Sequence, residues 1–240
     1  MKTFNIFNNV GIILSCIVVV THAKLAMIIR HGEKISDSSS GLSSKGMARA
    51  YCLVNAFGNN GTYATPEKIY AQSPTEKQQS TRPRDTVEPL AKILNIQLTL
   101  SYTSGQIKKL TKNIMNTSEE VVLVSWSNDN IPEIAEKFGI NSPPYWNSEV
   151  FDDIWMIYDQ ATPSFYKVNK ENKNLEKQQT YTGNEGYTLE IVKENIEDCI
   201  NENIDNFKNL NNTDTSNGPT LSLYTFMKVM TLLIILYITF

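Results

Sequence analysis

The residues that could carry out chemistry fall into three short polar segments of the 240-residue chain. The first is Arg30-His31-Gly32-Glu33, the second runs from Ser73 to Arg82, and the third is Asn128-Asp129. A neutral imidazole such as that of His31 is a nucleophile for phosphorus and can later pass the phosphoryl group to water. The arginine beside it and Arg82 would offer forked donors to the phosphoryl oxygens, which carry the charge during transfer. These residue types are compatible with phosphoryl transfer.

The composition argues against several other classes of protein. Hydrophobic residues make up 41% of the chain and charged residues 20%, which is ordinary for a globular protein. The net charge of −3 argues against a nucleic-acid partner, because a phosphate backbone needs a basic surface. Two histidines and three cysteines are too few for a zinc site, and motifs for a serine hydrolase, a P-loop or dinucleotide binding are missing. We therefore expect neither a metal nor a cofactor.

The first 23 residues predict a secretory signal peptide. Lys2 precedes an apolar run from Val10 to Val20, and small residues lie one and three positions before a break after Ala23. The run is short for a membrane span, although a signal anchor is the alternative. Cleavage after Ala23 would remove His22 and leave His31 as the single histidine of the mature chain.

The segment 217–240 predicts a signal for attachment of a GPI lipid anchor. Residues 229–240 are almost entirely apolar, and a spacer at 219–228 separates them from the small residues at 216–218, any of which could accept the anchor. A transmembrane segment is the alternative, but it would need about 20 apolar residues and would bury Lys228. We therefore expect a protein of the secretory pathway that reaches the cell surface or the extracellular space.

Between these ends, residues 24–210 predict one domain, followed by a short stalk at 211–216. Removing both ends takes away Lys2 and Lys228 and leaves a net charge of −5, from 20 basic against 25 acidic residues. Sequons for N-glycosylation, which fit a secreted glycoprotein, begin at Asn60, Asn116 and Asn211.

Strands and helices alternate through the first part of this domain. Apolar runs predict strands at 25–29, 68–73, 97–102 and 121–125. Helical periodicity and capping residues predict helices at 43–57, 82–94, 107–116 and from 129 or 130 to 138. This alternation predicts a three-layer α/β/α fold with a mainly parallel sheet. Because ligands bind at the carboxyl ends of such strands, we expect the three polar segments to form one site.

The composition changes after Tyr158. Residues 159–187 are rich in Asn, Lys, Glu and Gln and predict a loop-rich region. Apolar residues at helical spacing predict an amphipathic C-terminal helix at 188–210 that docks on the domain. Cys199 lies beside its apolar face and would pair with Cys52 in an oxidising compartment, with two buried free thiols as the alternative.

The chain from Leu25 to Tyr158 resembles the histidine phosphatase superfamily, also called the phosphoglycerate mutase-like family. The resemblance is carried by Arg30-His31-Gly32-Glu33, by Gly41 to Gly46 before the next helix, and by Ala71-Gln72-Ser73-Pro74 with the run from Ser80 to Thr86. It is closest to the small secreted fungal branch and implies a phosphoglycerate mutase-like fold.

The resemblance also implies roles for individual residues. His31 would be the nucleophile, and Arg30 and Arg82 would bind the phosphoryl oxygens, with Arg84 as a competing candidate for the second arginine. The expected partner is a phosphorylated small molecule or a phosphate anion, hydrolysed by way of a phosphohistidine.

The third polar segment departs from the family pattern. Where relatives carry Trp-Glu-His-Asp, this chain has Trp126-Ser127-Asn128-Asp129, so Asn128 replaces the second histidine. Asparagine can donate a hydrogen bond to a phosphoryl oxygen but carries no positive charge. Asp129 keeps the position of the residue that protonates the leaving oxygen, although it could equally cap a helix, and Glu33 is an alternative proton donor. Two functions follow: a phosphatase of reduced activity, or an inactive pseudophosphatase that binds a ligand or serves a structural role at the cell surface.

Overall fold

The structure is a computed structural model that describes residues 24–36, 39–159, 179–183 and 186–213. The predicted signal peptide and anchor segment lie outside these residues, as does most of the predicted loop-rich region. Within the described ranges, no helix has both the length and the hydropathy needed to cross a membrane.

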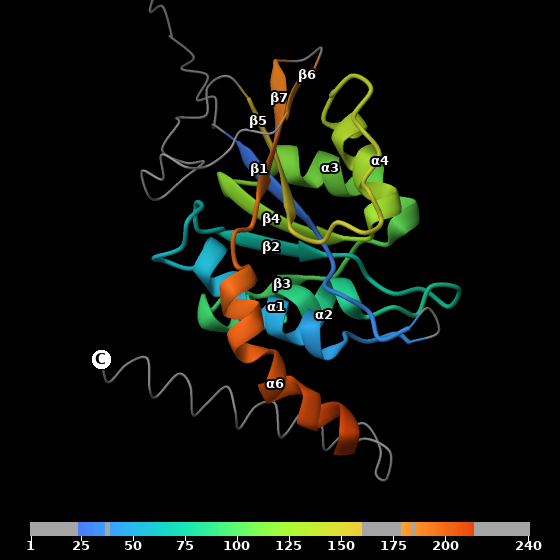
Figure 1. Cartoon of the computed structure of the whole chain (residues 1–240). Helices are drawn as coiled ribbons and strands as arrows, with labels where there is room; N and C mark the ends of the chain where they lie inside the picture. The colour runs from blue at the N-terminus through green and yellow to red at the C-terminus, as the bar shows by residue number, and fades with distance from the viewer. Residues whose placement is uncertain (1–23, 37–38, 160–178, 184–185, 214–240) are drawn as a thin grey trace, which may run out of the picture.

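The described residues form a seven-stranded mixed sheet in the order β3-β2-β4-β1-β5-β7-β6 (Figure 1). The strands from β3 to β1 are parallel, whereas β5, β7 and β6 join antiparallel. The strands are β1 (Leu25–Arg30), β2 (Lys68–Ala71), β3 (Leu98–Thr99), β4 (Val121–Trp126), β5 (Asp153–Asp159), β6 (Gln179–Thr182) and β7 (Tyr187–Lys193). The predicted parallel pairing is therefore confirmed for the half of the sheet that carries the polar segments.

Helices cover both faces of the sheet, which confirms the predicted three-layer α/β/α architecture. α1, α2 and α6 lie on one face, and α3 and α4 lie on the other (Figure 1). The helices are α1 (Ser44–Phe57), α2 (Arg82–Ile93), α3 (Ile107–Asn116), α4 (Ile131–Lys137) and α6 (Glu197–Thr213), with short 3-10 turns η1 (Ser104–Gln106) and η2 (Asn128–Asn130). Every residue of β1 and β4 is buried, because helices cover these central strands on both sides.

The start of α1 agrees with the sequence prediction, whereas the predicted caps of two other helices do not. α1 begins as predicted, with the Ser43 hydroxyl accepting a hydrogen bond from the backbone N–H of Gly46, and Pro83 occupies the first turn of α2. The side-chain caps expected from the sequence, Ser80 or Thr81 for α2 and Asp129 or Asn130 for α4, are wrong. Thr81 and Asn130 stand at the cap positions but make no capping hydrogen bond; the Thr81 hydroxyl donates to Asp85 instead.

The predicted helix at 188–210 is wrong in its first part. The segment Tyr187–Lys193 forms β7, which pairs with β5 and β6, and α6 begins only at Glu197. Pairing with β5 buries the apolar side chains of β7, so the partner strand outweighs the helical spacing. α6 extends to Thr213 and so includes the first residues of the predicted stalk at 211–216.

A disulfide joins Cys52 of α1 to Cys199 of α6, which decides between the two alternatives left by the sequence. The two Cα atoms are 6.0 Å apart, and the bond closes a loop with a sequence separation of 147 residues. It fastens the last described helix to the helix that follows the first polar segment.

Candidate functional site

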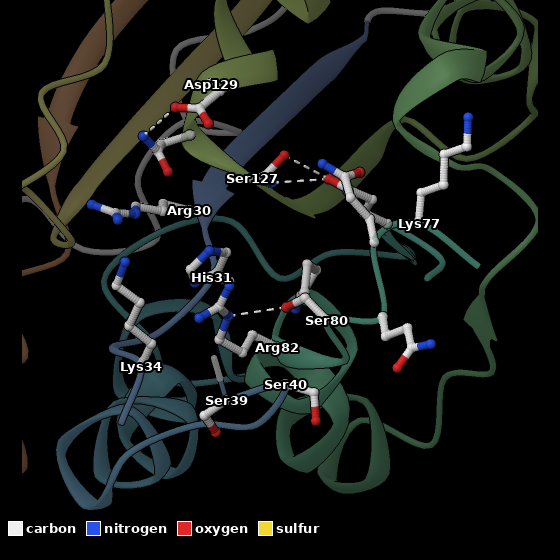
Figure 2. Close-up of a pocket in the computed structure, with 15 residues that line it drawn as sticks. Arg30, His31, Lys34, Ser39, Ser40, Lys77, Ser80, Arg82, Ser127 and Asp129 are labelled. Atoms are coloured by element: carbon white, nitrogen blue, oxygen red, sulfur yellow. Dashed lines mark hydrogen bonds between the residues drawn. The ribbon is translucent and has the colours of Figure 1, made fainter. Parts of the chain in front are cut away.

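The three polar segments meet in one pocket at the carboxyl ends of β1, β2 and β4 (Figure 2). The pocket has a volume of about 470 Å³. Among the described residues that line it, Arg30, Lys34, Lys77 and Arg82 are basic and Asp129 is acidic. Such a lining favours an anionic ligand. Within the described ranges, His, Cys, Asp and Glu side chains form no group that could hold a metal ion.

His31 is buried at this pocket, with 5% of its surface exposed. Its Nδ1 lies 2.8 Å from the carbonyl oxygen of Gly32, so Nδ1 carries the proton and Nε2 carries the lone pair. Burial, together with the charges of Arg82 and Arg30, lowers the pKa of His31 to about 4, although the hydrogen bond to Gly32 opposes the shift. The ring is therefore neutral at physiological pH, as a nucleophile must be.

Two contacts hold the His31 loop against the neighbouring helices. The backbone N–H of Gly32 donates to the Thr86 hydroxyl at 2.8 Å, and that hydroxyl donates to the carbonyl of Arg82 at 2.7 Å. On the other side, a Cβ atom at Gly46 would lie only 2.4 Å from the carbonyl oxygen of Glu33, so only glycine lets α1 approach this closely. The sequence analysis includes Thr86 only as the end of a motif and assigns it no role, although it is fully buried one turn into α2.

Arg30 lines the pocket but is partly committed to the protein. Its Nη1 donates to the carbonyls of Ser148 and Val150, and its guanidinium carbon lies 3.7 Å from the centre of the Phe151 ring. Burial lowers the pKa of Arg30 to about 10, so the side chain stays charged at neutral pH. Its Nε is buried and has no hydrogen-bond partner among the described residues.

Arg82 begins α2, and its Nε donates to the Ser80 hydroxyl at 2.9 Å. Figure 2 shows its guanidinium beside the His31 ring. The competing candidate, Arg84, does not line the pocket and instead forms an ion pair with Asp85 at 2.7 Å. The structure therefore places Arg82, and not Arg84, where an anion in front of His31 would bind.

Asn128 and Asp129 both line the pocket, and the Asn128 amide donates to Asp129 Oδ1 at 2.9 Å. Glu33 does not line it. Its carboxylate binds Arg49 of α1 with distances of 2.8 and 3.1 Å, because this buried guanidinium needs an anionic partner. The alternative of Glu33 as a proton donor to a ligand in the pocket is therefore wrong, and Asp129 is the carboxylate in position.

Sequence reasoning quoted Gln72 only as part of a motif and assigned it no role. The structure buries this residue beside the pocket, where its amide oxygen accepts hydrogen bonds from the backbone and the hydroxyl of Ser127. Its position directly after β2 is the signal that could have identified it, because residues after parallel strands line the ligand site.

No protein-family model matches the chain, and no curated protein matches it. Among solved structures, the protein histidine phosphatase SixA complexed with tungstate is similar, with 16% sequence identity and a TM-score of 0.40. The match covers 55% of this chain and 86% of that chain. A similarity of this size does not transfer an activity, because α/β folds serve many unrelated functions.

Proposed function

We propose that the chain is a member of the histidine phosphatase superfamily, of the small secreted branch, that hydrolyses phosphomonoesters through a phosphohistidine at His31. The observation that carries this proposal is the buried, neutral imidazole in a pocket that also contains Arg30 and Arg82. A buried neutral nucleophile beside two fixed guanidinium groups suits phosphoryl transfer, in which catalysis is mainly positioning and electrostatic stabilisation.

The reaction would proceed in two displacements. Nε2 of His31 attacks phosphorus as the bond to the ester oxygen breaks, and Asp129 gives its proton to that oxygen. The carbonyl of Gly32 stabilises the positive charge that the ring acquires, while Arg30 and Arg82 bind the phosphoryl oxygens. Water then attacks the phosphohistidine and returns a proton to Asp129, which releases inorganic phosphate and restores the neutral imidazole.

The test is hydrolysis of p-nitrophenyl phosphate by the purified full chain and by a His31→Ala variant. We expect the variant to lose all turnover above the uncatalysed rate and the wild type to form an acid-labile phosphohistidine during turnover. Arg84→Met is the matched control, because Arg84 lies outside the pocket. Equal rates for wild type and His31→Ala would overturn the proposal.

The role of Asp129 has a separate test that depends on the leaving group. An alkyl alcohol leaves only after protonation, whereas nitrophenolate leaves without it. We expect Asp129→Asn to lower the rate on an alkyl phosphate by about 10²–10⁴ and to change the nitrophenyl rate much less. An equal loss on both substrates would mean that Asp129 is not the proton donor.

A second candidate function is favoured by Asn128. No positive charge stands at this position, and one amide hydrogen of Asn128 is engaged by Asp129, so the chain could bind an anion without turning over an ester. The Asn128→His variant separates the two functions. A gain of about 10²–10³ in rate indicates a phosphatase with reduced activity, and no turnover in either form indicates an anion-binding pseudophosphatase.

We also propose that the protein resides at the cell surface, held by a GPI anchor or a C-terminal membrane segment. The disulfide between Cys52 and Cys199 supports an oxidising compartment. A phospholipase C specific for phosphatidylinositol should release the protein from intact cells if the anchor is GPI. Retention after that treatment, together with release by detergent, would indicate a membrane segment instead.

A further inference from the structure

Gln72 is a buried polar residue to which the mechanism above assigns no task. It directly follows β2, it is only 6% exposed, and it lines the same pocket as His31. A polar side chain is buried at a cost unless each of its donors and acceptors finds a partner.

Ser127 determines which way the Gln72 amide points. The backbone nitrogen of Ser127 lies 3.1 Å and its hydroxyl 2.8 Å from Oε1 of Gln72. A backbone N–H can only donate, so the atom facing it must be the amide oxygen and not the amide nitrogen. The Nε2 group is thereby turned away from Ser127, and within the described part of the chain it donates no hydrogen bond.

The end of β4 holds Gln72 and His31 on its two sides. The backbone N–H of Gln72 donates to the carbonyl of Ser125 at 3.1 Å, and that of His31 donates to the carbonyl of Trp126 at 3.0 Å. Each residue is the first one after its own strand. Neighbouring strands lie about 4.8 Å apart, so two side chains that flank one strand can reach the same phosphoryl group in front of it.

Asn128 is less suited to bind that group. It is half-buried, and its amide hydrogen bonds to the exposed carboxylate of Asp129. Gln72 is held by two hydrogen bonds before any ligand arrives. A donor that is already oriented stabilises developing charge more than one that must reorganise.

We propose that Nε2 of Gln72 is a ligand of the phosphoryl oxygens, and that it supplies a neutral donor from β2 in addition to the charged donors of Arg30 and Arg82. This rests on the proposed function, because it requires the phosphoryl group to bind in front of His31. No bond is made or broken at Gln72. Its contribution is a hydrogen bond that is present with bound phosphate and strengthens in the transition state.

The experiment compares the full chain with two charge-matched variants, Gln72→Glu and Gln79→Glu. The first keeps an acceptor for Ser127 but replaces the amide donor by a carboxylate, whereas the second adds the same charge at an exposed residue of the same pocket. Calorimetric titration with inorganic phosphate should show binding at least about tenfold weaker for Gln72→Glu, and kcat/KM on p-nitrophenyl phosphate should fall by about 10². For Gln79→Glu we expect a change of less than about threefold, because solvent screens its charge.

A third variant, Gln72→Met, keeps the length of the side chain without donor or charge, so it covers a failure of Gln72→Glu to fold. We expect phosphate binding by Gln72→Met to be about five- to tenfold weaker than in the wild type. Wild-type phosphate affinity in Gln72→Met, or equal losses in Gln72→Glu and Gln79→Glu, would overturn the role of Gln72 while the proposed function stands. The wild type could instead bind phosphate without turnover, with weaker binding in both Gln72 variants. That result would support Gln72 as a phosphate ligand and would reject the proposed phosphatase activity. If the wild type binds no phosphate, both fail.

Discussion

Two buried arginines flank the His31 loop, and their partners differ. Arg30 is 4% exposed and contacts two backbone carbonyls and the Phe151 ring, none of which carries a charge. Arg49 is 2% exposed and contacts three carboxylates, with distances of 2.8 Å to Glu33, 2.5 Å to Glu194 and 3.8 Å to Glu197. Within the described residues, the charge of Arg49 is thus neutralised by ion pairs, whereas Arg30 forms none.

This difference distinguishes Arg49, whose charge stabilises the fold, from Arg30, whose charge is available to a ligand. A buried charge is tolerated when ion pairs and hydrogen bonds satisfy it, and Arg49 meets that condition inside the fold. Burial raises the pKa of Glu194 to about 7 against the opposing pull of Arg49. Arg30 lines the pocket without a carboxylate partner among the described residues, so its charge is available to an anion there.

The largest effect on stability is expected from Arg49→Met. Removal of this cation leaves Glu33 and the fully buried Glu194 without their partner, so the free energy of unfolding should fall by about 3–5 kcal/mol. Urea denaturation measures the change. The control is Arg84→Met, where an exposed ion pair is lost and the change should stay within about 1 kcal/mol. A loss below about 1 kcal/mol for Arg49→Met would contradict the structural role of Arg49.

Arg30→Met should have the opposite profile. Because Arg30 forms no ion pair with a described carboxylate, we expect stability to change by about 1 kcal/mol, while kcat/KM on p-nitrophenyl phosphate falls by about 10²–10³. The same variant should lose the rise in melting temperature that added phosphate gives the wild type. If Arg30→Met keeps that rise, the arginine is structural like Arg49.

Loss of the disulfide should lower the stability of the fold without weakening phosphate binding in the pocket. The double variant Cys52→Ala with Cys199→Ala frees the loop of 147 residues in the unfolded chain, so the free energy of unfolding should fall by about 2–4 kcal/mol. Phosphate affinity should stay within about twofold of the wild type, because neither cysteine lines the pocket. A tenfold weaker affinity would show that α6 positions the pocket as well as stabilising the fold.

A further expected effect is a lowered pKa of His31 in the folded chain. In the folded chain the imidazole signal, identified by its loss in His31→Ala, should titrate near pH 4 in NMR spectra, whereas in urea it should titrate near about 6.5. The unfolded chain therefore takes up a proton at a higher pH than the folded chain, so acidification from about 6.5 to 4 should destabilise the fold. A folded-state midpoint near 6.5 would contradict the burial of the ring beside Arg30 and Arg82.

Much of the first half of the fold could be predicted, because its strands are buried on both faces and its helices have clear periodicity. The strand at Val121–Trp126 and the helix at Ile107–Asn116 needed no tertiary information. β7 could not be predicted in this way, because Tyr187–Lys193 becomes a strand only when it pairs with β5, and β5 itself carries no motif. Short segments with mixed periodicity depend on such partners.

In the candidate site, too, some residues could be predicted from the sequence and others could not. Arg30, His31 and Arg82 could be predicted from residue type, from their positions at a strand end or a helix start, and from the family resemblance. Glu33 and Arg84 were alternative candidates in the sequence, and in the structure they form ion pairs with Arg49 and Asp85 and do not line the pocket.

The sequence by itself determined the layered fold and the meeting of three polar segments, because apolar periodicity and strand ends are local properties. Only the tertiary structure decided which charges remain available to a ligand, because that depends on partners distant in sequence. Arg49 meets Glu194 from a strand end 145 residues away, and Gln72 meets Ser127 across 55 residues. The residue type determines which chemistry a side chain can carry out. The contacts that engage the side chain, or leave it available to a ligand, form only when the chain folds.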